Sequence, residues 1–487
     1  MATATIKECV TNFVDALKER NAAIFAGAGF SKTSGFVDWK ELMRDIAADL
    51  GLDVDKETDM IAIAQFHIND RLGNRSIVNQ SIINQFTKEA HLTKNHVILA
   101  DLPINTYWTT NYDNLIERAI EEAGKTPDIK RTSENMCITI PKRDAIVYKM
   151  HGDICLPNDA VITKEDFETY ELNRGAYSIV LQSHLVSNTF LFVGFSFEDP
   201  NLIYILTRIK NLLGTKNTRT HYCIFKKETD PEKIRKQELK LRDLNRYGIT
   251  AVLIDDYPQI TEILRQIETL YRRSQVFISG AAETFKDFGT DDSAKELIHN
   301  LSKEIVAKGK KIISGFGYNV GSGVINGALE HIFSTKYRKL DEYLKLMPFP
   351  QFTSGDFTGL SDVEKQIRKK ERNNLYRDLM LSEAGVAVFL FGNKEKKDIS
   401  GNITIINSNG MYEEFQIAKQ KGIKPIPVGA TGYMAKEIWN EVMKDFTFYY
   451  GNDEEIKEKL QVIGSKHSPQ QEIIKAIIFI IDKLNKG

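Results

Sequence analysis

The sequence predicts an α/β protein with two domains, each built on a parallel β-sheet. Three observations lead to this class. Short apolar segments of strand length alternate with longer segments whose apolar residues recur at helical spacing. Glycine-containing turns directly follow several apolar segments, as in sheets that carry ligands at the carboxyl ends of their strands. The pattern also starts again after residue 274, and 487 residues are too many for one typical domain.

Composition is that of an ordinary globular protein and excludes several functions. Hydrophobic residues make up 42% of the chain and the formal net charge is −1. A nucleic-acid-binding protein usually carries a basic excess, so we expect no nucleic-acid partner. Uninterrupted apolar runs such as 476–481 are far shorter than a membrane span, so we expect no membrane partner. The first residues lack the profile of a secretory signal, and we expect a cytoplasmic protein.

The cysteines argue against a structural metal site. Cys9, Cys137, Cys155 and Cys223 are far apart, and none forms the C-x-x-C pair that structural zinc sites use. We therefore predict free thiols and no bound metal.

The first half of the chain alternates predicted strands and helices, and the strands end in polar or glycine-containing turns. A charged segment at 226–243 is expected to be a solvated helix and loop. The predicted helices span 8–17, 39–50, 112–123 and 260–273, and the predicted strands span 22–25, 105–109, 145–150, 189–196, 221–225 and 250–254.

The second half repeats this organisation with different turns, so we predict two Rossmann-like domains over residues 1–273 and 274–487. Residues 341–357 mix Pro, Gly and aromatic residues and are expected to form an irregular insertion. A last helix is expected after Ser468 as N-cap, with Pro469 in its first turn. The other predicted helices span 294–308, 324–332 and 363–383, and the predicted strands span 276–278, 311–313, 385–391 and 424–428.

Three motifs of the first half belong together. A Gly-Ala-Gly-Phe-Ser turn at 27–31 follows the strand 22–25, and Thr-Asn-Tyr-Asp at 110–113 and His-Gly at 151–152 follow two later strands. A glycine turn before a helix lets backbone N–H groups approach a pyrophosphate. The three motifs in this order therefore indicate a nucleotide site.

Each motif alone has a simpler interpretation. The glycines at 27 and 29 could form only a tight turn between a strand and a helix. Asn111 could cap the helix predicted from residue 112. His151 could be a buried polar residue whose hydrogen bonds are satisfied. The occurrence of all three in order favours the functional interpretation.

In this order the motifs resemble the sirtuin family of NAD-consuming enzymes, over residues 8–255, with Thr110 where the family has Gln. Residues 35–39 resemble the family's stretch that covers the nicotinamide half of NAD. Residues 194–196 resemble its turn that holds the adenosine end. The resemblance implies NAD+ as substrate and catalytic roles for Asn111 and His151. The cofactor-binding residues that it implies are Gly27, Ala28, Gly29, Ser31, Asp38, Asp113, Gly194 and Ser196.

The implied side chains suit cleavage of the nicotinamide–ribose bond. An Asn side chain both donates and accepts, so Asn111 can fix ribose hydroxyls or hold a water against the reacting carbon. Imidazole groups titrate near neutral pH, so His151 can take a proton from a ribose hydroxyl or from water. Asp113 could orient Asn111 or the turn around it.

One departure from the family bears on the acceptor of ADP-ribose. Zinc-bearing protein deacylases of this family carry two C-x-x-C pairs, and this chain has none. Water is then the expected acceptor, which favours an NAD+ glycohydrolase. Two alternatives stay open, namely a zinc-free deacylase or ADP-ribosyltransferase, and a nucleotide sensor without catalysis.

Residues 275–487 resemble the SLOG family of nucleotide sensors. Two turns after strands, the Arg-containing helix around 376–380 and the segment 410–415 match its motifs, whereas the Pro-Gly-Gly loop of its hydrolase relatives is missing. This loss favours binding without hydrolysis. Arg377 and Lys394 can hold phosphates, and Glu414 can accept hydrogen bonds from ribose hydroxyls. Lys394 could also be a solvated loop lysine. The implied signal-binding residues are Ser279, Gly280, Gly315, Phe316, Gly317, Arg377, Lys394 and Glu414.

A sirtuin-like domain followed by a SLOG domain resembles the NADase effectors of the Thoeris antiphage defence system. The resemblance implies that a companion TIR-domain protein makes a cyclic ADP-ribose isomer, which binds the SLOG domain. The sirtuin-like domain then depletes cellular NAD+ in an abortive infection response. It also implies a homotetramer whose interfaces relay the signal. A signal can shift such a balance only through its differential affinity for two states.

Overall fold

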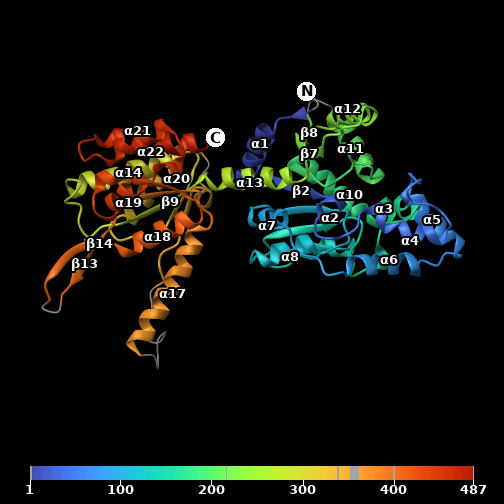
Figure 1. The fold of residues 1–487 in the computed structure, drawn as a ribbon, viewed down its shortest axis with the longest axis horizontal. Helices are drawn as coiled ribbons and strands as arrows, with labels where there is room; N and C mark the ends of the chain where they lie inside the picture. The colour runs from blue at the N-terminus through green and yellow to red at the C-terminus, as the bar shows by residue number, and fades with distance from the viewer. Residues whose placement is uncertain (1–2, 215–216, 337–338, 351–360, 399–400, 486–487) are drawn as a thin grey trace. The chain divides into compact units, whose positions relative to one another are not determined.

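A computed structural model describes residues 3–214, 217–336, 339–350, 361–398 and 401–485. The chain divides into two compact units, Met1–Glu268 and Thr269–Gly487 (Figure 1). Each unit is built on its own parallel sheet, which confirms the predicted α/β class. Within the described part of the chain, no helix is both long enough and apolar enough to cross a bilayer.

The first unit has an eight-stranded sheet in the order β1-β8-β7-β6-β2-β3-β5-β4. All neighbouring strands are parallel. The chain builds outward from β2 through β3 and β5 and then returns to the other side of β2 with β6. The order therefore reverses between β2 and β6, where such sheets bind ligands. The strands are β1 (Thr3–Ala4), β2 (Ala22–Ala26), β3 (Thr106–Thr109), β4 (Pro127–Lys130), β5 (Ala145–Lys149), β6 (Thr189–Val193), β7 (His221–Lys226) and β8 (Ile249–Ile254).

Helices such as α1, α8 and α12 pack on this sheet, another group forms a small core of its own, and α13 extends past Glu268, the last residue of the unit. Helices α3 to α6 bury Leu42, Ile46, Ile63 and Ile82 in one cluster. The helices are α1 (Ile6–Lys18), α2 (Ala28–Lys32), α3 (Trp39–Leu42), α4 (Arg44–Asp49), α5 (Met60–Asp70), α6 (Ser76–Phe86), α7 (Lys94–Asp101), α8 (Leu115–Glu122), α9 (Lys164–Glu168), α10 (Tyr170–Ser187), α11 (Pro200–Leu213), α12 (Pro231–Asn245) and α13 (Pro258–Arg272).

The second unit has a five-stranded sheet in the order β11-β10-β9-β12-β15, again with parallel neighbours. Its order reverses between β9 and β12. A separate antiparallel hairpin, β13–β14, follows β12. The strands are β9 (Gln275–Ala281), β10 (Lys311–Ser314), β11 (Leu344–Leu346), β12 (Val386–Phe391), β13 (Asn393–Lys397), β14 (Ile403–Asn407) and β15 (Lys424–Pro427).

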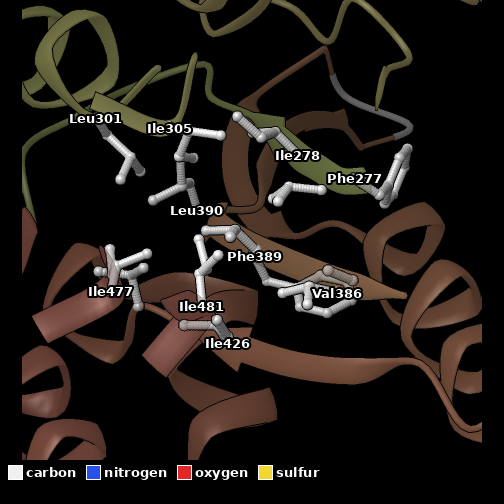
Figure 2. Close-up of a cluster of buried hydrophobic side chains, with 14 of the residues drawn as sticks. Phe277, Ile278, Leu301, Ile305, Val386, Phe389, Leu390, Ile426, Ile477 and Ile481 are labelled. Carbon is white, nitrogen blue, oxygen red and sulfur yellow. The ribbon is translucent and has the colours of Figure 1, made fainter. Parts of the chain in front are cut away.

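Aliphatic side chains from two helices cover one face of this sheet. Figure 2 shows Leu301 and Ile305 from one helix, and Ile477 and Ile481 from another, against strand residues such as Leu390. In Figure 1, the helix α17 and the hairpin β13–β14 project from the body of the unit. The helices are α14 (Asp291–Ala307), α15 (Gly321–Ser334), α16 (Leu340–Tyr343), α17 (Asp362–Leu381), α18 (Asn409–Gln420), α19 (Tyr433–Lys444), α20 (Phe446–Tyr450), α21 (Glu454–Gly464) and α22 (Gln470–Leu484).

Several expectations about local structure are wrong. The helix predicted at 39–50 is two short helices, α3 and α4, because the carbonyls of Trp39 and Glu41 both accept from the N–H of Met43 and close the first one. Part of the predicted irregular insertion forms α16 and the edge strand β11, while residues 351–360 lie outside the described part. Ser468 is not an N-cap, because its hydroxyl donates to the carbonyl of Val462 and the helix begins at Gln470.

Candidate functional site

The motifs of the first unit meet at the point where its strand order reverses. Gly27 follows β2, Gly194 follows β6, and Asn111 and His151 each lie two residues beyond the ends of β3 and β5. These four strands are neighbours in the sheet, and neighbouring strands lie about 5 Å apart. One edge of the sheet therefore carries all four turns.

The glycines of the turn at 27–31 allow it to touch the turn after β6. The N–H of Gly27 donates to the carbonyl of Val193 and that of Gly29 to the carbonyl of Gly194, both at 3.0 Å. A Cβ on Gly27 would lie 2.4 Å from the carbonyl oxygen of Gly194, which itself has a φ of +65°. Contact between the two turns thus explains these glycines, and both N–H groups bond within the protein.

Asn111 holds the glycine turn and does not cap a helix. Its Nδ2 donates to the carbonyl of Gly27 at 3.0 Å and to Oγ of Ser31 at 2.9 Å. The following helix α8 begins only at Leu115, so the interpretation of Asn111 as a helix cap is wrong. Within the described part of the chain, Oδ1 of Asn111 has no hydrogen-bond donor, which leaves it as the acceptor for a water or a hydroxyl.

A buried ammonium joins the loop of Asn111 to the loop of His151. Nζ of Lys149 lies 3.1 Å from a Glu117 oxygen and 3.4 Å from an Asp153 oxygen, and it donates to the carbonyl of Asp113. Burial lowers the pKa of Lys149, but the surrounding carboxylates outweigh burial and raise its pKa overall, so the ammonium stays charged. The carboxylate of Asp113 accepts from the N–H of Leu115. Sequence analysis missed Lys149, because two of its partners, Asp113 and Glu117, are distant along the chain.

The imidazole of His151 is buried, with 2% of the residue exposed. Its Nε2 lies 2.8 Å from Oδ2 of Asp199, and the ring of Phe167 packs edge-on against it at 5.3 Å. The glycine that follows His151, Gly152, has a φ of +103°, and a Cβ there would lie 2.9 Å from Cα of Ala160. The loop is therefore closely packed around the imidazole.

Asp199 is a site residue that sequence analysis missed. Its Oδ1 accepts from the N–H groups of Asn201 and Leu202, so it is the N-cap of α11. Burial raises the pKa of Asp199, but His151 and these two N–H groups outweigh burial and lower it overall. The Asp-Pro pair at 199–200 is a helix-start signal that could have located this residue.

The remaining predicted residues of the first unit lie around the same turns. Ser31 is buried under Asn111, and Ser196 is exposed beyond Gly194. Asp38 caps α3 by accepting from the N–H of Glu41, and it pairs with Lys32 of α2 at 2.6 Å. Burial raises the pKa of Asp38, but the hydrogen bonds from Lys32 and Glu41 lower it overall.

A polar cavity of about 270 Å³ borders the loop of His151. One of its lining residues, Val161, donates its N–H to the carbonyl of His151, and another, Tyr170, donates to the carbonyl of Met150. The guanidinium of Arg174 forms part of the wall and donates to the carbonyls of Asp159 and Lys149. No sequence motif indicated this cavity.

Three predicted side chains of the second unit, those of Ser279, Arg377 and Glu414, also converge at its strand reversal. The hydroxyl of Ser279, in β9, donates to Glu414 of α18 at 2.5 Å. Arg377 of α17 lies 2.5 Å from Glu413 and 3.7 Å from Glu414, and its guanidinium covers the ring of Phe349. Burial raises the pKa of Glu414, against the opposing effects of Ser279 and Arg377. Three elements thus bring the predicted side chains into one cluster.

A glycine of this second site allows the turn after β10 to touch the end of the strand β9. A Cβ on Gly317 would lie 1.8 Å from the carbonyl oxygen of Gly280, and Gly315 lies close to the sulfur of Met380 in α17. Phe316 lies between the glycines with a φ of +56° and is half exposed. Lys394 is exposed, as a solvated lysine would be, but it lies on the strand β13 and not in a loop, and within the described part of the chain it makes no hydrogen bond or ion pair with Arg377 or Glu414.

The four cysteines are free thiols, and the N–H of Cys155 donates to the carboxylate of Asp153 beside Lys149. Cys9 and Cys223 are buried, whereas Cys137 and Cys155 are exposed. Among the described residues, no group of three or more His, Cys, Asp or Glu side chains is placed to hold a metal ion.

Two family models match the chain, and together they define its class. Residues 105–252 match the SIR2-like domain, and residues 259–484 match the Sir2- and TIR-associating SLOG family. The protein therefore joins a SIR2-like domain to a SLOG domain, which confirms both resemblances.

Several known proteins are similar to this chain over nearly its whole length. It is 46% identical to NAD(+) hydrolase ThsA of Cytobacillus dafuensis over 100% of this chain and 98% of that protein. It is 42% identical to NAD(+) hydrolase ThsA of Bacillus cereus over 98% of both chains, and 41% identical to that of Acinetobacter baumannii over 97% of this chain and 99% of that one. The chain belongs to the ThsA family of NAD(+) hydrolases, the Thoeris effectors.

Proposed function

We propose that the first unit hydrolyses NAD+ with Asn111 and His151, and that the second unit binds a cyclic ADP-ribose isomer that activates it. Membership of the ThsA family makes the chain an NAD+ hydrolase. The roles of individual residues are our proposal. It depends on one observation above all, the junction of the Asn111 and His151 loops through Lys149 at the strand reversal.

The reaction breaks the bond between the nicotinamide nitrogen and the ribose carbon and adds water. Nicotinamide leaves with the electron pair, water oxygen bonds to the ribose carbon, and one proton is released. Oδ1 of Asn111 would hold the water or a ribose hydroxyl, and His151 would take the proton. The turns at 27–31 and 194–196, with Asp38 and Asp113, would line the dinucleotide site.

The charges of the second unit suit a small nucleotide with two phosphates. Arg377 can make paired hydrogen bonds to phosphate oxygens, and Lys394 adds a second positive charge. Glu414 can accept from ribose hydroxyls. The hairpin β13–β14 occupies the place of the missing catalytic loop, which favours binding without hydrolysis.

Burial of the catalytic side chains supports regulation. Asn111 is 7% exposed and His151 is 2% exposed, so a ribose reaches them only after local opening. An activator would stabilise the open state through its higher affinity for that state. A TIR-domain partner is the proposed source of the activator, since the SLOG family that matches is described as Sir2- and TIR-associating. NAD+ depletion would then be the antiviral response.

Release of nicotinamide by the purified chain tests the proposal. We expect hydrolysis that increases with a cyclic ADP-ribose isomer, with kcat lowered about 10²- to 10⁴-fold by His151→Ala or Asn111→Ala. His467→Ala, at an exposed histidine of the second unit, is the matched control. NAD+ loss only with an acyl-peptide or a protein acceptor would favour a deacylase or transferase instead. Binding of both nucleotides without any turnover would favour a sensor.

The homotetramer is a separate part of the proposal. Gel filtration with light scattering should give four chains per particle. A monomer both with and without the cyclic ADP-ribose isomer would contradict it.

A further inference from the structure

A carboxylate outside the predicted motifs faces the proposed base. Nε2 of His151 lies 2.8 Å from Oδ2 of Asp199, and both side chains are almost fully buried. Nδ1 of His151 is buried as well and has no hydrogen-bond partner within the described part of the chain. The two nitrogens of the ring thus have different surroundings.

We propose that Asp199 is a positioning residue that keeps the proton of neutral His151 on Nε2 and leaves the lone pair on Nδ1. An ionised carboxylate only accepts, so the nitrogen that faces it must carry a hydrogen. The other nitrogen then has the free lone pair that a base needs. This inference rests on the proposed catalytic role of His151.

The carboxylate is held rigidly enough for this role. Its Oδ1 accepts from the N–H groups of Asn201 at 2.8 Å and Leu202 at 3.2 Å, and Pro200 fixes the first residue of α11. Oδ2 is thereby left for His151. The two atoms are within hydrogen-bond distance but not aligned, and catalytic hydrogen bonds often align only when substrate is bound.

Asp199 also balances the positive charge that forms on His151 during the reaction. When a water or ribose O–H gives its proton to Nδ1, the imidazole becomes an imidazolium in a buried site. The negative charge of Asp199 balances this positive charge at short range. The imidazolium then returns its proton to solvent, and neutral His151 is restored with its proton on Nε2.

Asp199→Asn tests the inference with little change in shape. The new amide oxygen can still cap α11, whereas the amide nitrogen donates to Nε2 and drives the proton onto Nδ1. We expect kcat for nicotinamide release to fall about 10²- to 10⁴-fold, with KM changed less than about twofold. Glu198→Gln removes the same charge from the adjacent exposed residue and should leave both constants unchanged.

Nitrogen NMR of histidine-labelled protein reads the tautomer independently of turnover. The His151 signals, assigned by their loss in His151→Ala, should show the proton on Nε2 in the wild type and on Nδ1 in Asp199→Asn. A wild-type proton on Nδ1, or an Asp199→Asn kcat equal to the wild type, would overturn the inference. A wild type that releases no nicotinamide would instead refute the proposed function. The NMR spectrum would still show which nitrogen of His151 carries the proton and so would still test the inference.

Discussion

In the first unit the polar side chains of the site bond to backbone atoms as well as to one another, whereas in the second the predicted side chains contact one another. Asn111 bonds to the carbonyl of Gly27, and Lys149 to the carbonyl of Asp113. Arg377, by contrast, lies between the carboxylates of Glu413 and Glu414. Both sites occupy the strand reversal of a parallel sheet, and both need glycines where a turn packs closely against a neighbouring segment.

The difference between the sites matches the two proposed tasks. A reaction site needs groups held in one geometry, and bonds to backbone atoms provide it. A sensor site must change when its ligand arrives, and an ion pair between side chains can exchange one partner for a phosphate. In this proposal the same sheet position serves catalysis in one unit and signal binding in the other.

The largest effect should come from adding one methyl group to a glycine turn. Gly27→Ala places a Cβ 2.4 Å from the carbonyl of Gly194, and a displaced turn moves Asn111. We expect nicotinamide release to fall about 10²-fold or more, with unchanged binding of a cyclic ADP-ribose isomer by calorimetry. Gly317→Ala places a Cβ 1.8 Å from the carbonyl oxygen of Gly280 and should abolish binding of the isomer. The first unit should keep its melting transition in this variant.

Gly175→Ala is the matched control for both variants. A Cβ there would meet only a Glu171 side-chain oxygen at 3.8 Å, so rate and binding should be unchanged. Equal loss of both functions in Gly27→Ala would contradict the separation of the two sites.

Loss of the buried ammonium should destabilise the first unit. Lys149→Met leaves the buried carboxylates of Glu117 and Asp153 without this partner, at a cost of about 3–5 kcal/mol in the free energy of unfolding. Denaturant unfolding of the full chain measures it. Lys240→Met breaks only an exposed pair with Glu198, worth at most about 1 kcal/mol. Similar costs for the two variants would show that Lys149 does not join the loops as described.

A smaller effect of opposite sign is expected in the second unit. Glu413 lies 2.5 Å from Arg377 and competes with an incoming phosphate for the guanidinium. Glu413→Gln should therefore strengthen binding of a cyclic ADP-ribose isomer by up to about tenfold, or about 1.4 kcal/mol. Calorimetry measures this, with the exposed Glu458→Gln as control. Weaker binding in Glu413→Gln would mean that this carboxylate contacts the ligand instead of competing with it.

Sequence patterns predicted what local chemistry determines. The central strands and the glycine turns that follow them were located, since each is a short contiguous signal. The helix predicted from residue 112 begins instead at Leu115, because Asn111 reaches back to the glycine turn rather than forward along the chain. Helix propensity depends on neighbouring residues and therefore cannot predict a hydrogen bond to a distant turn.

The candidate sites were predicted in part for the same reason. Ser279, Arg377 and Glu414 were chosen from separate motifs, and the fold brings them together. Sequence analysis missed the contacts of Lys149 with Asp113 and Glu117 and the pairing of Asp199 with His151, because each joins residues far apart in the sequence. The Asp-Pro start of α11 was visible, but only the fold shows that its second oxygen faces His151.

The initial rate of nicotinamide release, titrated with a cyclic ADP-ribose isomer, tests the coupling of the two sites most directly. The wild type should show a rate that rises and saturates, whereas Arg377→Ala should keep the low initial rate at every concentration. His151→Ala should release nicotinamide about 10²- to 10⁴-fold more slowly while it still binds the isomer. The account would be contradicted if the wild-type rate did not change with the concentration of the isomer. It would also be contradicted if the titration curve of Arg377→Ala matched that of the wild type.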